Sequence, residues 1–458
     1  MQQHLGIWDF ILTPFFILIL SAIARKMRDK RYPPGHPLRQ YFMKALFLKF
    51  AGAIFIALVY QYYYGGGDTF NYFNHTKIIN SSRDESFSIW FRLMTRSSVV
   101  EHPDLYKYAT RMEWYTDPSS YTVPVVASVF SLVTGTNYLP IAMLFAFFSF
   151  TGVWAMYRTI VNIYPKLHKE LAIAFLFIPS TFVWGSAVFK DTICMFGVGW
   201  LTYTTFRMFV NRDYSGKNIF LLCLSFYMIL NTKIYILLAF IPALSIWLLT
   251  TYSSRIKSSS VRFVTKIIFI GISFVGFLFF TRLFANQLQR YSLENIATTA
   301  TSTREWLAYS SGDEGSSYDL GAFDPSIFGM LVKFPQAVVV TFFRPFPWEA
   351  RKVIVMLSAL EALAFAYFTF RAFQKRGIAK TFGLIAKDPN LLFCLIFSVI
   401  FGFAVGISSY NFGSLSRYKI PALPFYAAFL MIVMNYHKTS FDSNPAQLKS
   451  ARKEPALA

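Results

Sequence analysis

The residues of this chain best placed to do chemistry are charged side chains at short turns between apolar segments. Asp68 follows the glycine run 65–67, directly after one such segment. Glycines let the backbone turn sharply and leave room for a ligand. A carboxylate held there can act as a general base or bind a cation. The simpler interpretation is a helix stop followed by a solvated acid.

Two further turns carry a charge between apolar segments. Asp191 follows a turn that starts at Pro179 and precedes an expected helix, where the helix dipole favours its charge. It is therefore either a helix cap or a functional acid. Lys233 lies in a minimal turn, and its ammonium can hold a phosphate as a point charge. The alternative for Lys233 is a lysine that snorkels to the membrane interface.

Three more cations fall near the end of the chain. Arg344 lies in an elbow of prolines and aromatics, where it can fork onto a phosphate or pair locally with Glu349. Arg417 and Lys419 lie in one turn that we place outside the membrane, against the usual bias of positive charge toward the inside. Anion binding explains this exception, because a structural pair needs a nearby acid that the sequence does not identify.

Taken together, these turns predict one site of cations around carboxylates. Such a site suits a phosphate leaving group and a base for an incoming hydroxyl. We predict Asp68 and Asp191 as catalytic residues. The predicted substrate-binding residues are Lys233, Arg344, Arg417, Lys419, Tyr72, Trp184 and Trp348, the aromatic ones as platforms for sugar rings. No histidine or carboxylate cluster has metal-ligand spacing, so no metal or other cofactor is predicted, although a divalent cation is compatible with the acids.

The elements that must position these residues follow from composition. Of 458 residues, 55% are hydrophobic and only 15% are charged, and the mean hydropathy is +0.42. These values exclude disordered and ordinary soluble classes and predict an all-α, multi-pass membrane bundle. The net charge of +21 then indicates membrane topology and anionic lipid partners rather than nucleic acid.

Eleven stretches approach the length of a membrane span, which is about 20 residues. They are 7–24, 45–64, 137–158, 170–187, 192–207, 218–232, 234–250, 267–284, 350–370, 390–408 and 419–436. Placing the N-terminus outside and the C-terminus in the cytoplasm puts 26 of the 44 Lys and Arg residues in inside segments and 15 of the 23 acids outside. This orientation agrees with the positive-inside rule along the whole chain.

The same reading predicts a single transmembrane domain, residues 1–438, followed by a polar cytoplasmic tail, 439–458. Two long outer regions, 65–136 and 285–349, are expected to be ordered because they are rich in aromatics. The stretch 121–135 is expected to be an interfacial or re-entrant helix on the outer side.

The order of these features resembles the GT-C class of integral membrane glycosyltransferases. The matching features are Asp68 as the acid of the first outer loop, the helix 123–135 leading into Asn137, the turn with Pro179, Ser186 and Asp191, the pair Thr232-Lys233, and the segment with Arg417, Tyr418 and Pro421. The family often carries paired acids in the first loop, whereas Asp68 is followed by Thr69. The pair Asp84-Glu85 lies well beyond the membrane edge, which leaves the identity of the base open.

The spacing of Gly67, Asp68 and Tyr72 also resembles bacterial O-antigen and exopolysaccharide polymerases. Both resemblances imply sugar transfer from a polyprenyl-phosphate-linked donor to a glycan or lipid acceptor, at the outer face of a bacterial inner membrane. They differ in whether one sugar or a whole repeat unit moves.

Two other classes of function stay open. A transporter or flippase of lipid-linked oligosaccharides is expected to carry polar groups near the bilayer midplane, often in repeated halves. Here Glu361 and Lys49 are the main mid-span charges, and no repeat is visible. A non-catalytic subunit of an envelope complex would need no cluster of cations.

Overall fold

The computed structural model describes residues 3–253, 296–311, 316–321 and 326–439, with a few single positions between 258 and 324. Within these residues every regular element is helical, and Ser317 and Asn411 form one isolated antiparallel bridge. The α-helices are α1 (Ile7–Arg31), α2 (Arg39–Leu58), α3 (Asp68–Glu85), α4 (Phe87–Met94), α5 (Tyr106–Ala109), α6 (Pro118–Thr134), α7 (Tyr138–Ile163), α8 (His168–Leu176), α9 (Pro179–Trp184), α10 (Lys190–Asn211), α11 (Gly216–Leu230), α12 (Tyr235–Ser253), α15 (Ile296–Ser311), α16 (Ile327–Val332), α17 (Phe334–Phe343), α18 (Val353–Arg376), α19 (Ile378–Lys387), α20 (Pro389–Ser408), α21 (Phe412–Tyr418) and α22 (Leu423–Asn435).

Seven of the described helices are long and apolar enough to cross a membrane. They are α1, α2 with the π-helical turn 59–63 that extends it, α7, α10, α12, α18 and α20. An eighth span results if α21 and α22, which meet at a bend of 70°, are counted as one. The all-helical, multi-pass prediction is confirmed at this level. The predicted count of eleven is not reached among the described residues.

The remaining predicted spans have other outcomes. The stretch 170–187 forms two short helices, α8 and α9, because Pro179 cannot continue α8 and instead starts α9. The stretch 218–232 forms α11, which has only 15 residues. The predicted span 267–284 and the tail from 440 onward lie outside the described residues.

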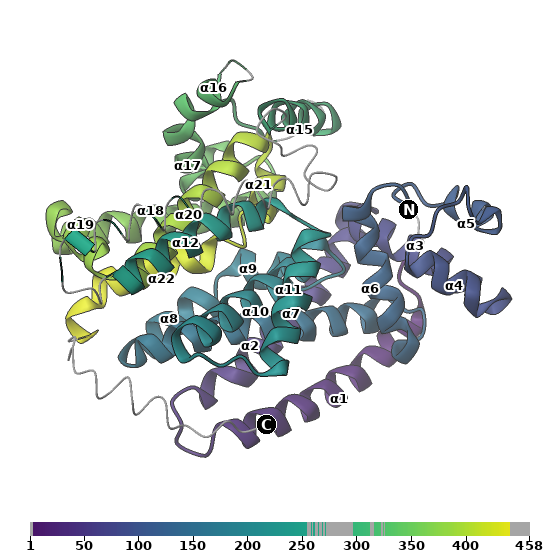
Figure 1. Ribbon diagram of the computed structural model, residues 1–458. Helices are drawn as coiled ribbons and strands as arrows, with labels where there is room; N and C mark the ends of the chain where they lie inside the picture. Colours follow the sequence, from purple (N-terminus) through teal and green to yellow (C-terminus); the bar gives the residue numbers. More distant parts are fainter. Residues whose placement is uncertain are drawn as a thin grey trace.

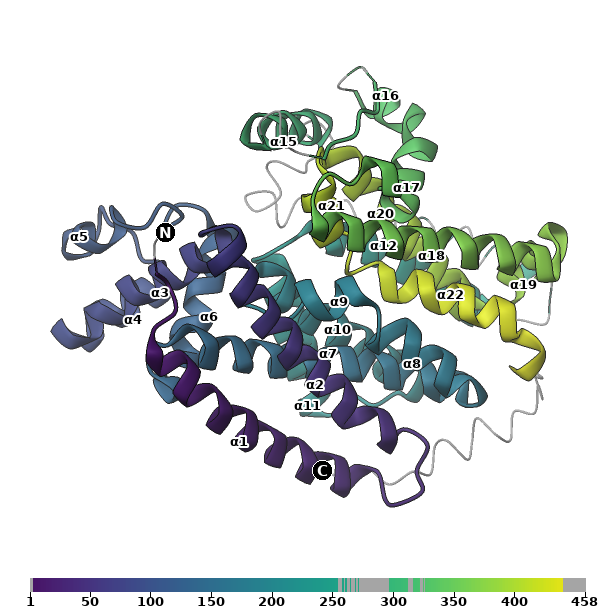
Figure 2. The ribbon, with the colours of Figure 1, turned by 180° about the vertical axis from the view of Figure 1, so that it is seen from behind.

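The helices form two groups, which Figures 1 and 2 show one above the other from opposite sides. The lower group contains α1, α2, α7, α10 and α11, and the upper group contains α12, α17, α18, α20 and α22. The two most closely packed helices of the lower group are α7 and α10. They touch through Gly152 and Gly199, where a methyl group on either glycine would overlap the backbone of the opposite helix.

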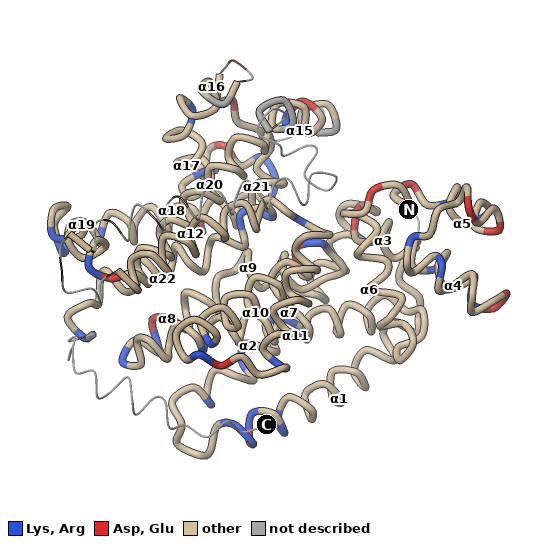
Figure 3. The backbone as a smooth tube through the Cα atoms, viewed as in Figure 1, with Lys and Arg blue, Asp and Glu red and all other residues tan. Residues whose placement is uncertain are grey.

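The bundle has two chemically different ends. At one end, which we call the basic end, lie segments 25–44, 158–170, 207–217 and 371–389, with 18 Lys and Arg against four Asp and Glu. Hydrogen bonds join segment 158–170 to 25–44, through His168 and Tyr41, and to 371–389, from the Tyr164 hydroxyl to Asp388 Oδ2 at 2.6 Å. Figure 3 shows this concentration of blue where α1 ends, at α8 and at α19, while red gathers on α3 to α5.

The opposite end, which we call the site end, collects the turns singled out in the sequence. Helices α3 to α6 extend from it and bury a small apolar core of their own, with Trp90, Leu93, Tyr108 and Tyr121 among its members. The predicted helix 121–135 is present as α6, which packs on α3. The site end is therefore built partly from bundle termini and partly from this α3–α6 group.

Candidate functional site

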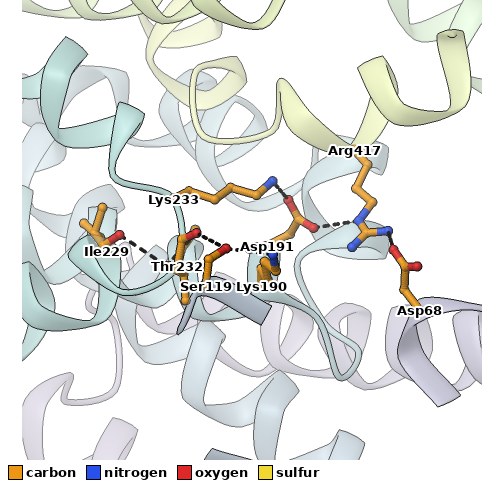
Figure 4. A network of polar contacts seen from close by, with 9 residues as sticks. Asp68, Ser119, Lys190, Asp191, Ile229, Thr232, Lys233 and Arg417 are labelled. Atoms are coloured by element: carbon orange, nitrogen blue, oxygen red, sulfur yellow. Dashed lines mark hydrogen bonds and ion pairs between the residues drawn. The ribbon is translucent and has the colours of Figure 1, made fainter. Parts of the chain in front are cut away.

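Asp191 lies at the centre of an ion-pair cluster at the site end (Figure 4). It is the second residue of α10 and its side chain is 0% exposed. Lys233 Nζ lies 2.5 Å from one carboxylate oxygen, and Arg417 Nε lies 2.7 Å from the other. A buried carboxylate is tolerated only when it is paired and hydrogen-bonded. Both oxygens of Asp191 meet this condition, and the N-terminus of α10 adds a favourable dipole.

Arg417 joins Asp191 to Asp68. Its Nη1 lies 2.8 Å from Asp68 Oδ2 while its Nε contacts Asp191, and its guanidinium lies over the Phe189 ring at 4.2 Å. The planar fork of arginine makes such a bridge possible, whereas a lysine offers a single point of charge. Arg417 is the next-to-last residue of α21, which lies beside the upper group, so it ties the two groups of helices together at this point.

Asp68 differs from Asp191 in exposure. It begins α3, and its side chain is 48% exposed. The three preceding glycines all have positive φ values, 69°, 147° and 120°, a region that other residues rarely adopt. The sequence prediction of a sharp turn before Asp68 is thus matched by the backbone. In this position one carboxylate oxygen of Asp68 contacts Arg417, and the side chain remains half-exposed.

Thr69 directly follows Asp68, at the position where the GT-C family that the sequence resembles often carries a second acid. It is buried, with its hydroxyl 2.6 Å from the Tyr138 hydroxyl. It also donates to the Val188 carbonyl at 3.1 Å. This bond fixes the start of α3 against the loop that leads into α10. Thr69 therefore fixes the position of Asp68 relative to Asp191.

Lys190 extends the cluster on the far side of Asp191. Its Nζ donates to Ser119 Oγ at 2.7 Å and lies 3.9 Å from Asp117 Oδ2, at the start of α6. Burial works against the charge of Asp117, but Lys190 and a hydrogen bond from Ser120 hold the pKa of Asp117 below its ordinary value. The adjacent Lys190 and Asp191 therefore point to different partners. The signal for Asp117 was the Asp-Pro pair that caps α6.

Lys49 and Glu361, the two mid-span charges, hold the short helix α9 at its two ends. Lys49 Nζ donates to the carbonyls of Thr181 at 3.1 Å and Gly185 at 2.7 Å, and also to Ser149 Oγ. The Ser180 N–H donates to Glu361 Oε2 at 2.8 Å. A cation at the C-terminal carbonyls and an acid at the first N–H both match the helix dipole. Since α9 leads through residues 185–189 to Asp191, this arrangement also supports the cluster.

Two predicted binding residues lie outside the cluster. Arg344 forms the local pair with Glu349 that the sequence left as the alternative, and it lies over the Phe412 ring at 5.4 Å. Lys419 is fully buried, and its Nζ has no hydrogen-bond partner among the described residues. Neither residue contacts Asp68 or Asp191. The acid that the sequence could not supply for Arg417 is present twice, as Asp68 and Asp191.

The predicted aromatic platforms are not alike. Tyr72 and Trp184 are buried, and Tyr72 packs on Trp114 with ring centroids 4.6 Å apart. Burial also raises the pKa of the Tyr72 phenol well above its ordinary value. Stacking on a sugar requires a ring face that these two side chains do not present here. Trp348 is 80% exposed and stacks on Phe346, so one of its faces is open.

The cluster balances three acids against three cations. These are Asp68, Asp117 and Asp191 with Lys190, Lys233 and Arg417. Side-chain exposure is 6% for Lys233, 12% for Arg417 and 19% for Lys190. An anion entering from outside therefore meets Arg417 and Lys190 first and has to compete with carboxylates for them. Within the described residues no group of three or more His, Cys, Asp or Glu side chains is placed to hold a metal ion.

Comparison of the chain with known protein families, with curated proteins and with solved structures finds no match. The resemblance to GT-C glycosyltransferases and to polysaccharide polymerases thus stays a prediction from the residues quoted above.

Proposed function

We propose that the chain is an integral membrane glycosyltransferase that uses a polyprenyl-phosphate-linked sugar and acts at the outer face of a bacterial inner membrane. The observation that carries the proposal is the position of Asp68. Its half-exposed carboxylate lies beside the guanidinium of Arg417, at the edge of a cluster whose cations are largely buried. A base next to a phosphate-binding group is what transfer to a hydroxyl requires.

In the proposed reaction the acceptor hydroxyl attacks the anomeric carbon of the donor sugar. The bond from that carbon to the phosphate oxygen breaks, and its electron pair leaves with the lipid phosphate. The hydroxyl proton passes to Asp68. The Arg417 guanidinium, which pairs with Asp68 in the structure, pairs with the phosphate instead. Lys190 adds a second cation near the entrance, and Asp191 with Lys233 holds Arg417 in place. Catalysis then rests on positioning and electrostatics.

The proposed orientation places the site end outside and the basic end in the cytoplasm. It is supported by the excess of Lys and Arg in the segments of the basic end. It also brings the exposed tyrosines 62–64, just before the glycine turn, to the depth where aromatic side chains favour the membrane interface. A lipid-linked donor would reach Asp68 along this interface.

A flippase for lipid-linked oligosaccharides is the alternative from another class, and broken helices such as α8–α9 are typical of transporters. In transporters the ends of broken helices bind substrate or ions. In this chain both ends of α9 are occupied by Lys49 and Glu361 of the protein itself. This difference favours the enzyme.

The proposal is tested with the purified full chain in lipid vesicles, supplied with polyprenyl-phosphate-linked labelled sugars and candidate acceptors. We expect release of polyprenyl phosphate together with a new glycosidic bond. Asp68→Asn should lower this rate by at least about 100-fold, the scale of a general base. Asp84→Asn, on the exposed part of the same helix, should leave it unchanged.

Two results would contradict the proposal. One is movement of labelled lipid-linked sugar between leaflets with no new glycosidic bond, which would support the flippase. The other is full transfer activity in Asp68→Asn, which would remove this carboxylate from the mechanism. Transfer of repeat units rather than single sugars would instead assign the chain to the polymerase alternative.

A further inference from the structure

A cavity of about 520 Å³ opens at the basic end, between the end of α1 and the start of α2. It lies at the opposite end of the bundle from Asp191, so its role does not depend on the reaction proposed above. Its lining residues are Arg28, Gly35, His36, Pro37, Arg39, Gln40, Met43 and Lys44. Three of these eight residues, Arg28, Arg39 and Lys44, have a cationic side chain, and none has an acidic one.

The cations of the cavity are only partly neutralised. Asp29 lies 2.8 Å from Arg28 and 2.7 Å from Arg39, so one carboxylate serves two guanidinium groups. Arg39 is further fixed by donating to the Tyr32 carbonyl at 2.6 Å. Lys44 is exposed and has no partner among the residues that the structure describes. The cavity therefore keeps a net positive charge of about two, with arginine forks already held in place.

The surface next to the cavity is apolar and exposed. On α1, Ile23 and Met27 are each 45% exposed, and on α2 Phe47 is 43% exposed. Met27 adjoins Arg28, Phe47 follows Lys44 by three positions and Ile23 precedes Arg28 by five, all on the side toward the middle of each span. Both helices are long and apolar enough to cross a membrane, so this strip faces lipid tails.

We propose that this cavity binds the phosphate head group of an anionic phospholipid, whose acyl chains run along the strip formed by Ile23, Met27 and Phe47. Arginine forks and a free ammonium recognise the phosphate oxygens. Basic pockets between membrane helices on the cytoplasmic side are suited to such head groups. The adjoining apolar strip distinguishes a lipid from a free phosphate, which would gain nothing from it.

The test measures binding of phosphatidylglycerol, phosphatidylcholine and inorganic phosphate to the purified full chain in a neutral detergent, by native mass spectrometry and by thermal stabilisation. We expect phosphatidylglycerol to bind and stabilise the protein, and the other two to do so far more weakly. Lys44→Gln should weaken phosphatidylglycerol binding about fivefold, the effect of one cation at a membrane surface. Lys44→Arg should keep it.

The matched control is Lys380→Gln, an exposed lysine of α19 at the same end of the bundle that does not line the cavity. It should bind phosphatidylglycerol as the unaltered chain does. Equal binding of phosphatidylglycerol and phosphatidylcholine, or equal losses in Lys44→Gln and Lys380→Gln, would overturn the proposal. Inorganic phosphate that stabilises the protein as well as the lipid would assign the cavity to a free anion and would also overturn it.

Discussion

Arg417 and Asp191, separated by 226 positions in the sequence, form a buried ion pair with 2.7 Å between Nε and Oδ2. The same guanidinium reaches Asp68, so one side chain of α21 holds a carboxylate of α3 and a carboxylate of α10. Lys233 holds the other oxygen of Asp191. Removal of any one member changes the charge of the whole cluster.

Arg417→Ala is expected to lower stability by about 3 kcal/mol, because it leaves Asp191 buried with one partner fewer. Arg417→Lys should cost less, since it keeps the charge but cannot bridge both acids. Thermal unfolding in one fixed detergent measures the effect. Arg371→Ala, which removes an exposed arginine of α18, serves as the control. Adding Asp191→Asn to Arg417→Ala should recover part of the loss, and a simple sum of the two effects would contradict the coupling.

Lys49→Met is expected to destabilise the chain by about 3 kcal/mol, because the Thr181 and Gly185 carbonyls lose their buried donor. Lys380→Met alters an exposed lysine of α19 and should have little effect on unfolding. The transfer activity of Lys49→Met should also fall, since α9 supports the loop before Asp191. A variant that unfolds at the wild-type temperature would mean that Lys49 does not hold α9.

Gly199→Ala is expected to cost about 2–3 kcal/mol, because the added methyl group would overlap the Gly152 backbone where α7 meets α10. Gly383→Ala on α19 is the matched control, since a methyl group there meets nothing within 4 Å. The control should be neutral or slightly stabilising, as alanine favours a helix over glycine. Equal unfolding temperatures for the two variants would show that α7 and α10 separate without cost.

Because His75 is buried, we predict that the protein loses stability in mild acid. Burial lowers the pKa of His75 from 6.5 to about 4, and its ring packs edge-on against Trp114 at 5.1 Å. Between pH 6.5 and 4, His75 is therefore protonated in the unfolded chain but neutral in the folded chain. The stability that neutral His75 contributes is complete above pH 6.5 and is lost as the pH falls toward 4.

His75→Phe should flatten the pH dependence of the unfolding temperature between 6.5 and 4, because the ring is kept and the titration is removed. His102→Phe controls for the loss of a histidine elsewhere in the α3–α6 group. An unchanged pH profile in His75→Phe would place the acid sensitivity on another residue.

The positions of the turns could be predicted from the sequence, and their partners could not. Asp68 and Asp191 lie at the ends of apolar segments. There the glycines, prolines and charges of the sequence itself indicate a turn. The exposure of Asp68 and the burial of Asp191 depend on which segments pack over them. The contact from Arg417 to Asp68 joins residues 349 positions apart, a distance at which no local pattern acts.

The aromatic residues illustrate the same limit. Trp184 and Trp348 both stand near prolines at predicted outer turns, yet one is buried and the other is 80% exposed. Lys49 and Glu361 were the main mid-span charges in the sequence, and they were too few to favour a transporter over an enzyme. Their actual partners are backbone groups of α9, a helix that exists as a separate element only because Pro179 interrupts the span.

The ion pairs of Asp191 also set an order of events during synthesis. Lys233 follows Asp191 by 42 residues, so it leaves the ribosome soon afterwards and can neutralise the acid as α11 and α12 insert. Arg417 follows by 226 residues, which at 5–20 residues per second is a delay of about 10 to 45 s. A chain that ends before α21 would lack Arg417, so Asp68 and Asp191 would be left without the cation that they share.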